Sequence, residues 1–171
     1  MIPVSSALSS GLIWSKISCN RDYELKLNNE LVGRLHKPSF WSSEFEAETQ
    51  AGRWTFRRGG FCGTGAAIVD SVSKQTVATS KSGWGGRARL TFADGQTFQV
   101  ECKGWWRPVW SVFTESSQPV LHIQTREKTV DLPAGSAVTN DRLAMLIMFT
   151  WYCVLRAEED AAAAVMVAAV S

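Results

Sequence analysis

Hydrophobic and polar residues alternate over most of this chain, in short segments separated by turn residues. A period of two is typical of β-strands that have one buried and one wet face. The breaks carry Gly, Pro, Asn or Ser, and no helical pattern interrupts the series, so βαβ units are not expected. The pattern predicts about twelve strands, near residues 12–18, 23–27, 31–36, 44–48, 53–58, 65–72, 76–81, 86–92, 96–103, 108–114, 119–124 and 127–131.

Three hairpin registers follow from asking which alignment pairs apolar residues with apolar residues. The test favours a loop at residues 93–95 that ends in Gly95, a loop at residues 28–30 and a four-residue loop at residues 49–52. Each hairpin then has one apolar face and one face on which opposite charges match. The predicted pairs are Leu90–Phe98, Ala88–Val100, Thr91–Thr97, Arg89–Gln99, Arg87–Glu101, Leu27–Leu31, Tyr23–Leu35, Glu24–Arg34, Phe45–Phe56, Ala47–Trp54, Glu44–Arg57 and Glu48–Arg53.

A different pattern begins at Leu143, where the chain is almost wholly apolar as far as Leu155. A helix of this length spans about 20 Å at ~1.5 Å per residue, well short of the ~30 Å hydrocarbon layer of a bilayer. A helix that is apolar on every side and too short to cross a membrane is typically buried inside a protein. Something must therefore enclose this segment.

A wide barrel provides such an enclosure. Eight strands make a barrel filled by its own side chains, whereas twelve leave room for a helix ~10 Å across. We predict a mainly β fold: a closed antiparallel barrel of about twelve strands around a buried apolar C-terminal helix. One domain covers residues 1–171, with strands from about 12 to 132, the central helix from about 140 to 158 and an Ala-rich tail at 161–171. Three interpretations of the tail stay open: it prolongs the helix, docks on another subunit, or frays.

This organisation resembles the tubby C-terminal-domain superfamily, which includes the LURP-one-related proteins and the phospholipid scramblases. The features that carry the resemblance are the Val69-Asp70 strand, its turn into Thr76-Val77, and the terminal apolar helix. The chain is close in size to the LURP-one-related group. It lacks the Cys-rich and Pro-rich segments of the scramblases and a clear copy of tubby's paired-cation phosphoinositide site. The resemblance implies a tubby-like barrel with a helix along its axis.

Composition and cysteine usage indicate the class of protein and its compartment. The chain has 171 residues and a net charge of +2, which is too small to argue for a nucleic-acid partner. Its four cysteines, Cys19, Cys62, Cys102 and Cys153, are far apart and show no metal-ligand spacing. The N-terminus lacks the basic and continuous apolar regions of a signal peptide. We therefore expect a cytoplasmic protein, with a peripheral location at a membrane as a further expectation.

Basic residues interleave with aromatic ones in three places, at residues 53–58, 84–89 and 103–108. Arg and Lys bind phosphate oxygens, and Trp favours polar–apolar boundaries, so such segments suit an anionic lipid headgroup. The simpler interpretation is that the tryptophans are core residues and the arginines pair across strands. The cations without a cross-strand partner in the predicted registers, together with the neighbouring tryptophans, form the predicted headgroup site: Arg58, Arg89, Lys103, Arg107, Trp84, Trp105 and Trp106.

Signals for catalysis or metal binding are weak. The Gly-rich segments at residues 59–65 and 83–86 lack the Lys-Ser/Thr of a phosphate-binding loop and suit strand bends better. Nucleophilic catalysis would pair Cys62 with His36 or His122, yet no spacing places them together. We expect no enzyme activity, no metal and no cofactor.

Two function classes remain. The first is a non-enzymatic binding or scaffold protein of tubby-like type, which contacts an anionic membrane surface, a phosphoinositide or a protein partner. The second is a lipocalin-like carrier of a small apolar ligand, suggested by Gly52-Arg53-Trp54, a match to the start of that family's motif. An axial helix that is apolar all round favours the first class, because a carrier needs an empty barrel interior.

Overall fold

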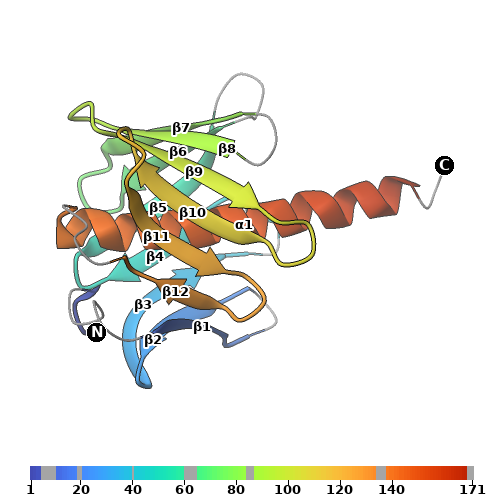
Figure 1. Ribbon diagram of the computed structural model, residues 1–171, viewed down its shortest axis with the longest axis horizontal. Helices are drawn as coiled ribbons and strands as arrows, with labels where there is room; N and C mark the ends of the chain where they lie inside the picture. The colour runs from blue at the N-terminus through green and yellow to red at the C-terminus, as the bar shows by residue number, and fades with distance from the viewer. Residues whose placement is uncertain are drawn as a thin grey trace.

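Twelve β-strands and one helix make up the part of the chain that the structure describes (Figure 1). The computed structural model describes residues 1–4, 11–18, 21–39, 41–59, 65–83, 87–133 and 138–168. The elements are β1 (Leu12–Lys16), β2 (Tyr23–Leu27), β3 (Glu30–His36), β4 (Phe45–Thr49), β5 (Gly52–Gly59), β6 (Gly65–Asp70), β7 (Thr76–Ser82), β8 (Arg87–Phe92), β9 (Thr97–Lys103), β10 (Val109–Thr114), β11 (Pro119–Gln124), β12 (Thr129–Asp131) and α1 (Asn140–Ala168).

The strands form a closed antiparallel barrel. Each strand pairs with its neighbours in the chain, and the barrel closes where Leu12 and Ile13 of β1 pair with Val130 and Thr129 of β12. Because the barrel is closed, it has no edge strand whose unpaired backbone groups could bond a strand of another chain. The predicted fold class is confirmed, with each expected strand in place and its ends displaced by a few residues at most.

The hairpin registers are those predicted, with one exception. The predicted β8–β9 pairs all occur, and so do the β4–β5 pairs from Glu48–Arg53 to Phe45–Phe56. Glu44 precedes β4 and meets Arg57 in an ion pair at 3.0 Å, while Arg53 and Glu48 form one at 2.6 Å. The β4–β5 turn is shorter than the predicted loop at residues 49–52, because Thr49 pairs with Gly52. In β2–β3 the predicted pair Leu27–Leu31 is wrong, because Leu27 pairs with Glu30. The turn there has only two residues, Asn28 and Asn29, both at positive φ, and asparagine is one of the residues that tolerate this conformation. A bulge at Leu25/Lys26 then restores the predicted register further along.

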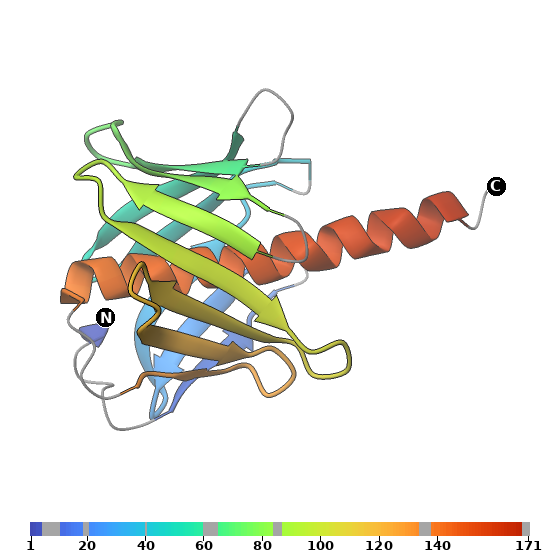
Figure 2. The same cartoon turned by 45° about the horizontal axis from the view of Figure 1, so that its top comes forward.

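Helix α1 runs through the barrel (Figure 2). Its residues from 143 to 155 are buried, apart from the half-buried Cys153, and five of its side chains are completely enclosed: Leu146, Ile147, Met148, Phe149 and Thr150. Trp151 stacks on Trp14 of β1 with ring centroids 5.0 Å apart. On the other side, Tyr152 packs against Phe45 and Phe56 at 5.5 and 5.4 Å. Strands from different parts of the barrel therefore share one core with the helix.

One close approach between barrel and helix depends on a glycine. A Cβ placed on Gly33 of β3 would lie 2.1 Å from Cε of Met148, and 2.9 Å from Cγ2 of Thr49. Glycine at this position leaves the space that the end of the Met148 side chain occupies against β3.

An ion pair fixes the start of α1 to the barrel. Arg142 lies 2.7 Å from the carboxylate of Asp94 in the β8–β9 turn, bonds Gln96 as well, and sits 4.5 Å from the ring of Phe92. The hydrogen bond from Arg142 and one from the Gln96 backbone hold the pKa of Asp94 below its ordinary value of 3.8. The contact thus tethers the first turn of the helix at one mouth of the barrel.

The helix is longer than expected. It continues without a break past residue 158 to Ala168, so the Ala-rich tail prolongs the helix over its described part. The acidic residues Glu158, Glu159 and Asp160 lie within the helix instead of ending it. From residue 161 onward every described residue is exposed, and the helix projects from the barrel (Figures 1 and 2).

Phe149→Asp is expected to prevent folding, because it places an unpaired carboxylate in the barrel interior. Phe149→Ala should lower the free energy of unfolding by about 3–5 kcal/mol, through lost burial and the cavity left behind. Circular dichroism and urea unfolding measure both effects. The control is Met166→Asp, on the exposed part of the same helix, which should leave the fold unchanged. A soluble Phe149→Asp protein with the native β-sheet spectrum would contradict the central position of the helix.

Asp94→Asn should lower the melting temperature at pH 7 and change it little near pH 2. The folded-state pKa of Asp94 is depressed, so the stability it contributes is present above its ordinary pKa of 3.8 and is lost as the pH falls through the lower folded-state value. Thermal melts of both proteins across this range test the linkage. An equal difference in melting temperature at both pH values would show that the carboxylate charge is not the cause.

Candidate functional site

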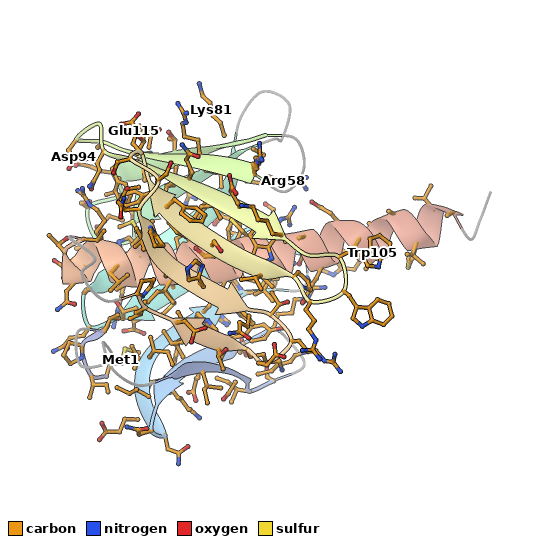
Figure 3. All side chains as sticks on the ribbon, viewed as in Figure 1. Met1, Arg58, Lys81, Asp94, Trp105 and Glu115 are labelled. Atoms are coloured by element: carbon orange, nitrogen blue, oxygen red, sulfur yellow. The ribbon has the colours of Figure 1, made fainter. Side chains whose placement is uncertain are left out.

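The two mouths of the barrel differ, because α1 enters at one and leaves at the other. Asp94 marks the entry mouth in Figure 3, where the turns after even-numbered strands lie. The loops after odd-numbered strands lie at the opposite mouth, where the helix leaves. We call the described residues of the loops after β1, β3, β9 and β11 the exit rim; they span residues 17–18, 21–22, 37–39, 41–44, 104–108 and 125–128.

Exposed hydrophobic side chains concentrate at the exit mouth. Of the ten large hydrophobic residues exposed in the described chain, seven belong to the exit rim or to the projecting end of α1. Single exposed hydrophobic residues are normal on a protein, but this distribution is strongly one-sided. The seven are Ile17 (55%), Trp41 (91%), Trp105 (95%), Trp106 (81%), Val165 (69%), Met166 (72%) and Val167 (71%).

Trp105 and Trp106 lie in the loop between β9 and β10. Gly104 starts this loop at a φ of +93°, and a Cβ there would lie 2.7 Å from the carbonyl oxygen of Arg107, so the tight turn requires glycine. The turn projects both indoles outward, and Figure 3 shows Trp105 pointing away from the barrel. The simpler interpretation of these tryptophans as core residues is wrong for this pair, since both are exposed.

Three cations lie in the loop of this tryptophan pair and in the loop joined to it. Thr125 donates hydrogen bonds from its backbone N–H and from Oγ1 to the carbonyl oxygen of Pro108, at 3.3 and 2.9 Å. These bonds join the β11–β12 loop, which carries Arg126 and Lys128, to the β9–β10 loop, which carries Arg107. All three side chains are exposed, and none forms an ion pair with another described residue. We call Trp105, Trp106, Arg107, Arg126 and Lys128 the tryptophan patch.

The other predicted site residues are dispersed. Lys103 has a partner, because its Nζ lies 3.0 Å from Glu101 and 5.9 Å from the ring centre of Phe113. Arg58, also expected to be unpaired, lies 3.9 Å from Asp160 of α1. Arg89 is on the outer wall of β8, directly opposite Lys81 of β7, so two like charges share one cross-strand position. Trp84 lies outside the described residues.

Four cations gather where α1 leaves the barrel. Arg21 and Lys37, from two exit loops, and Arg156 from the helix converge on the carboxylate of Glu159, with Lys37 at 2.8 Å and Arg156 at 2.6 Å. Lys37 is 7% exposed, and burial lowers its pKa, as do the charges of Arg21 and Arg156. Asp160 beside them accepts the longer contacts from Arg58 and Arg156. This cluster holds the helix at the exit mouth, as Asp94 does at the entry.

Sequence reasoning missed several of these residues. Trp41 and Arg126 lie in predicted breaks between strands, and exposure follows from that position. Lys128 was expected inside the strand at residues 127–131, but that strand begins only at Thr129, which leaves Lys128 in the exposed loop. A loop tryptophan that belongs to no alternating pattern has no buried face to occupy, and this signal is present at Trp41. The Glu159 cluster had no such signal, since its members are separated by up to 138 residues (Arg21 to Glu159).

The described residues show few features of a metal-binding or catalytic site. They contain no group of three His, Cys, Asp or Glu side chains placed to hold a metal ion. Cys153 and Cys102 are free thiols, and burial raises the pKa of Cys153 to about 12. His36 contacts Asp22 at 2.6 Å and His122 contacts Ser111 at 2.8 Å, while Cys62 lies outside the described residues. No described helix is long and apolar enough to cross a membrane.

Comparisons with known proteins found no relative of this chain. The chain matches no family model, no curated protein and no solved structure. Its function must therefore be argued from the exit mouth itself.

Glu159→Gln is expected to lower the free energy of unfolding by roughly 3 kcal/mol, near the lower end for a broken buried ion pair, because it leaves a desolvated Lys37 without its counter-charge. Adding Lys37→Met should recover part of the loss, since the buried cation is then removed. Urea unfolding of the single and double variants measures this. The matched control is Glu158→Gln, one residue away and exposed. Equal losses for Glu158→Gln and Glu159→Gln would refute the role of the cluster.

Proposed function

We propose that this protein is a non-enzymatic, tubby-like binding protein that docks on an anionic membrane surface through its exit rim. The observation that carries the proposal is the collection of exposed tryptophans and cations around the mouth from which α1 leaves. The proposed location is the cytoplasmic face of a membrane, where the anionic lipids are found.

The tryptophans suit a flat interface. The β3–β4 and β9–β10 loops are six strands apart in the order of the barrel, so Trp41 and the Trp105–Trp106 pair lie on opposite sides of the mouth. Amphipathic indole rings favour the headgroup level of a bilayer, where one end is apolar and the other wet. Aromatic residues on both sides of a mouth can engage a plane at once, whereas a small ligand would need them on one side.

The cations of the tryptophan patch suit an anionic surface. Each Lys or Arg close to such a membrane contributes about 1 kcal/mol, so Arg107, Arg126 and Lys128 together supply ~3 kcal/mol, reduced by salt. Arg89 and Lys81 extend the positive charge along the barrel wall. These cations form no ion pair with a described residue, so no such ion pair has to be broken when they bind the membrane.

The architecture supports this class over the carrier. Side chains of α1 fill the barrel interior from residue 143 to residue 155, which is the space that a lipocalin-like carrier would keep for its ligand. A binding function therefore belongs to the outer surface or the mouths. A phosphoinositide is one candidate anionic lipid, and a protein partner is the alternative if vesicles do not bind.

Co-sedimentation with vesicles tests the proposal. We expect binding to vesicles that contain phosphatidylserine or phosphoinositide, no binding to neutral ones, and weaker binding as salt is raised. Arg107→Glu should reduce the affinity about tenfold or more, since it removes one favourable charge and adds a repulsive one. Arg89→Glu should act in the same direction.

The controls use the entry mouth. Lys74→Glu changes an equally exposed cation in the β6–β7 turn and should leave vesicle affinity unchanged. Trp105→Ala combined with Trp106→Ala should weaken binding at all salt concentrations, because the indole contribution is not screened. Failure of the unaltered protein to bind any vesicle, or equal losses for Lys74→Glu and Arg107→Glu, would refute docking through the exit rim.

A further inference from the structure

The end of α1 beyond the ion-pair cluster is apolar on all its sides. Residues 161–168, Ala-Ala-Ala-Ala-Val-Met-Val-Ala, contain no charged or polar side chain, and each of them is exposed. We call this segment the α1 extension. It projects from the centre of the exit mouth, beyond the ends of the strands (Figure 2).

The arrangement of its large side chains indicates whether a protein partner or a lipid bilayer would surround the α1 extension. Val165, Met166 and Val167 are consecutive, so at about 100° per residue they point to three different sides of the helix. Another protein packed against a helix covers one face, and such a helix has an apolar stripe and a polar back. A bilayer covers every side of a helix that enters it end-on. The all-round exposure of these three residues therefore matches lipid better than a second protein chain.

Geometry links the extension to docking of the rim. Asp160 is level with the mouth, because it contacts Arg58 at the end of β5. The eight residues that follow advance about 12 Å at ~1.5 Å per residue. The rim tryptophans can reach a flat membrane together only if this segment passes below the surface. The polar headgroup layer is roughly 5–7 Å deep on each side, so the tip would reach the upper acyl chains.

We propose that the α1 extension inserts end-on into the bilayer and anchors the docked barrel without crossing it. This inference rests on the proposed docking of the exit rim and adds the part that enters the lipid. The segment is less than half the length of a membrane span.

The charges at the base of the extension suit this position. Glu159 and Asp160 would repel an anionic surface if they were unpaired. Each is held instead by cations of the barrel or of the helix itself: Glu159 by Arg21, Lys37 and Arg156, and Asp160 by Arg58 and Arg156. The step from a charged belt, in which Glu159 and Asp160 are paired and the exposed Glu158 has no ion pair with a described residue, to a wholly apolar segment matches the step from headgroups to acyl chains.

A fluorescent label reports insertion directly. Met166→Cys carries the environment-sensitive dye NBD in the full chain, and Val72→Cys, equally exposed at the entry mouth, is the matched control. Cys19 and Cys62 are replaced by Ser, whereas Cys102 and Cys153 remain, because burial raises the pKa of both thiols and suppresses labelling. On addition of phosphatidylserine vesicles, emission from position 166 should shift to the blue and rise severalfold. Position 72 should not change.

The outcomes separate this inference from the proposed function. If the protein co-sediments with vesicles but NBD at position 166 stays in water, the rim docks without insertion and the inference is overturned. If the protein binds no vesicle, both proposals fall. If NBD at position 166 responds to protein concentration without vesicles, and sedimentation equilibrium shows a dimer, the extension packs on a second copy and insertion is again refuted.

A charge substitution gives an independent test. Met166→Glu places a carboxylate in the acyl boundary and should weaken vesicle binding about tenfold, while Val72→Glu should have no effect. Because Met166 is 72% exposed, the fold should be unaffected, which circular dichroism verifies. Equal vesicle affinity of the Met166→Glu and unaltered proteins would overturn insertion.

Discussion

The enclosure of one apolar helix is the constraint on which the rest of this structure depends. The segment from Leu143 to Leu155 has no polar side that could face water, so it requires neighbours all around. Twelve strands provide a barrel of sufficient width, and the helix provides the core that such a barrel lacks on its own. Neither part would be stable alone, and contacts such as Trp14–Trp151 and Phe56–Tyr152 make the two a single core.

Filling the barrel in this way also decides where function can reside. The interior holds side chains of α1, so the proposed binding surface lies on the outer wall or at the mouths. The mouths are made unequal by the direction of the helix, which is tethered by Arg142 and Asp94 where it enters and by the Glu159 cluster where it leaves. Within the part of the chain that the structure describes, only the exit mouth combines exposed tryptophans, unpaired cations and a projecting apolar helix. This asymmetry is the basis of the proposed docking on a membrane.

Local rules account for most of the fold. Alternating hydrophobicity predicted each strand, because a one-residue slip would turn every buried side chain outward. Charge matching predicted ion pairs such as Arg53–Glu48. The failure at Leu27 arose where turn chemistry outweighed the apolar pattern: two asparagines at positive φ formed a tighter turn, and a bulge absorbed the extra residue.

The residues of the candidate site also fall into two groups: those that the sequence placed together and those that only the tertiary structure brought together. The sequence by itself determined that Trp105, Trp106 and Arg107 share a loop, because neighbours in a chain stay neighbours, and that the apolar helix lies inside the barrel. Only the tertiary structure decided that Arg126 and Lys128 join them, that Arg58 and Lys103 have partners, and that Arg21 and Lys37 meet Glu159. Contacts between loops depend on barrel closure and on the direction of the helix, and these are set by the packing of the whole chain, which no local pattern encodes.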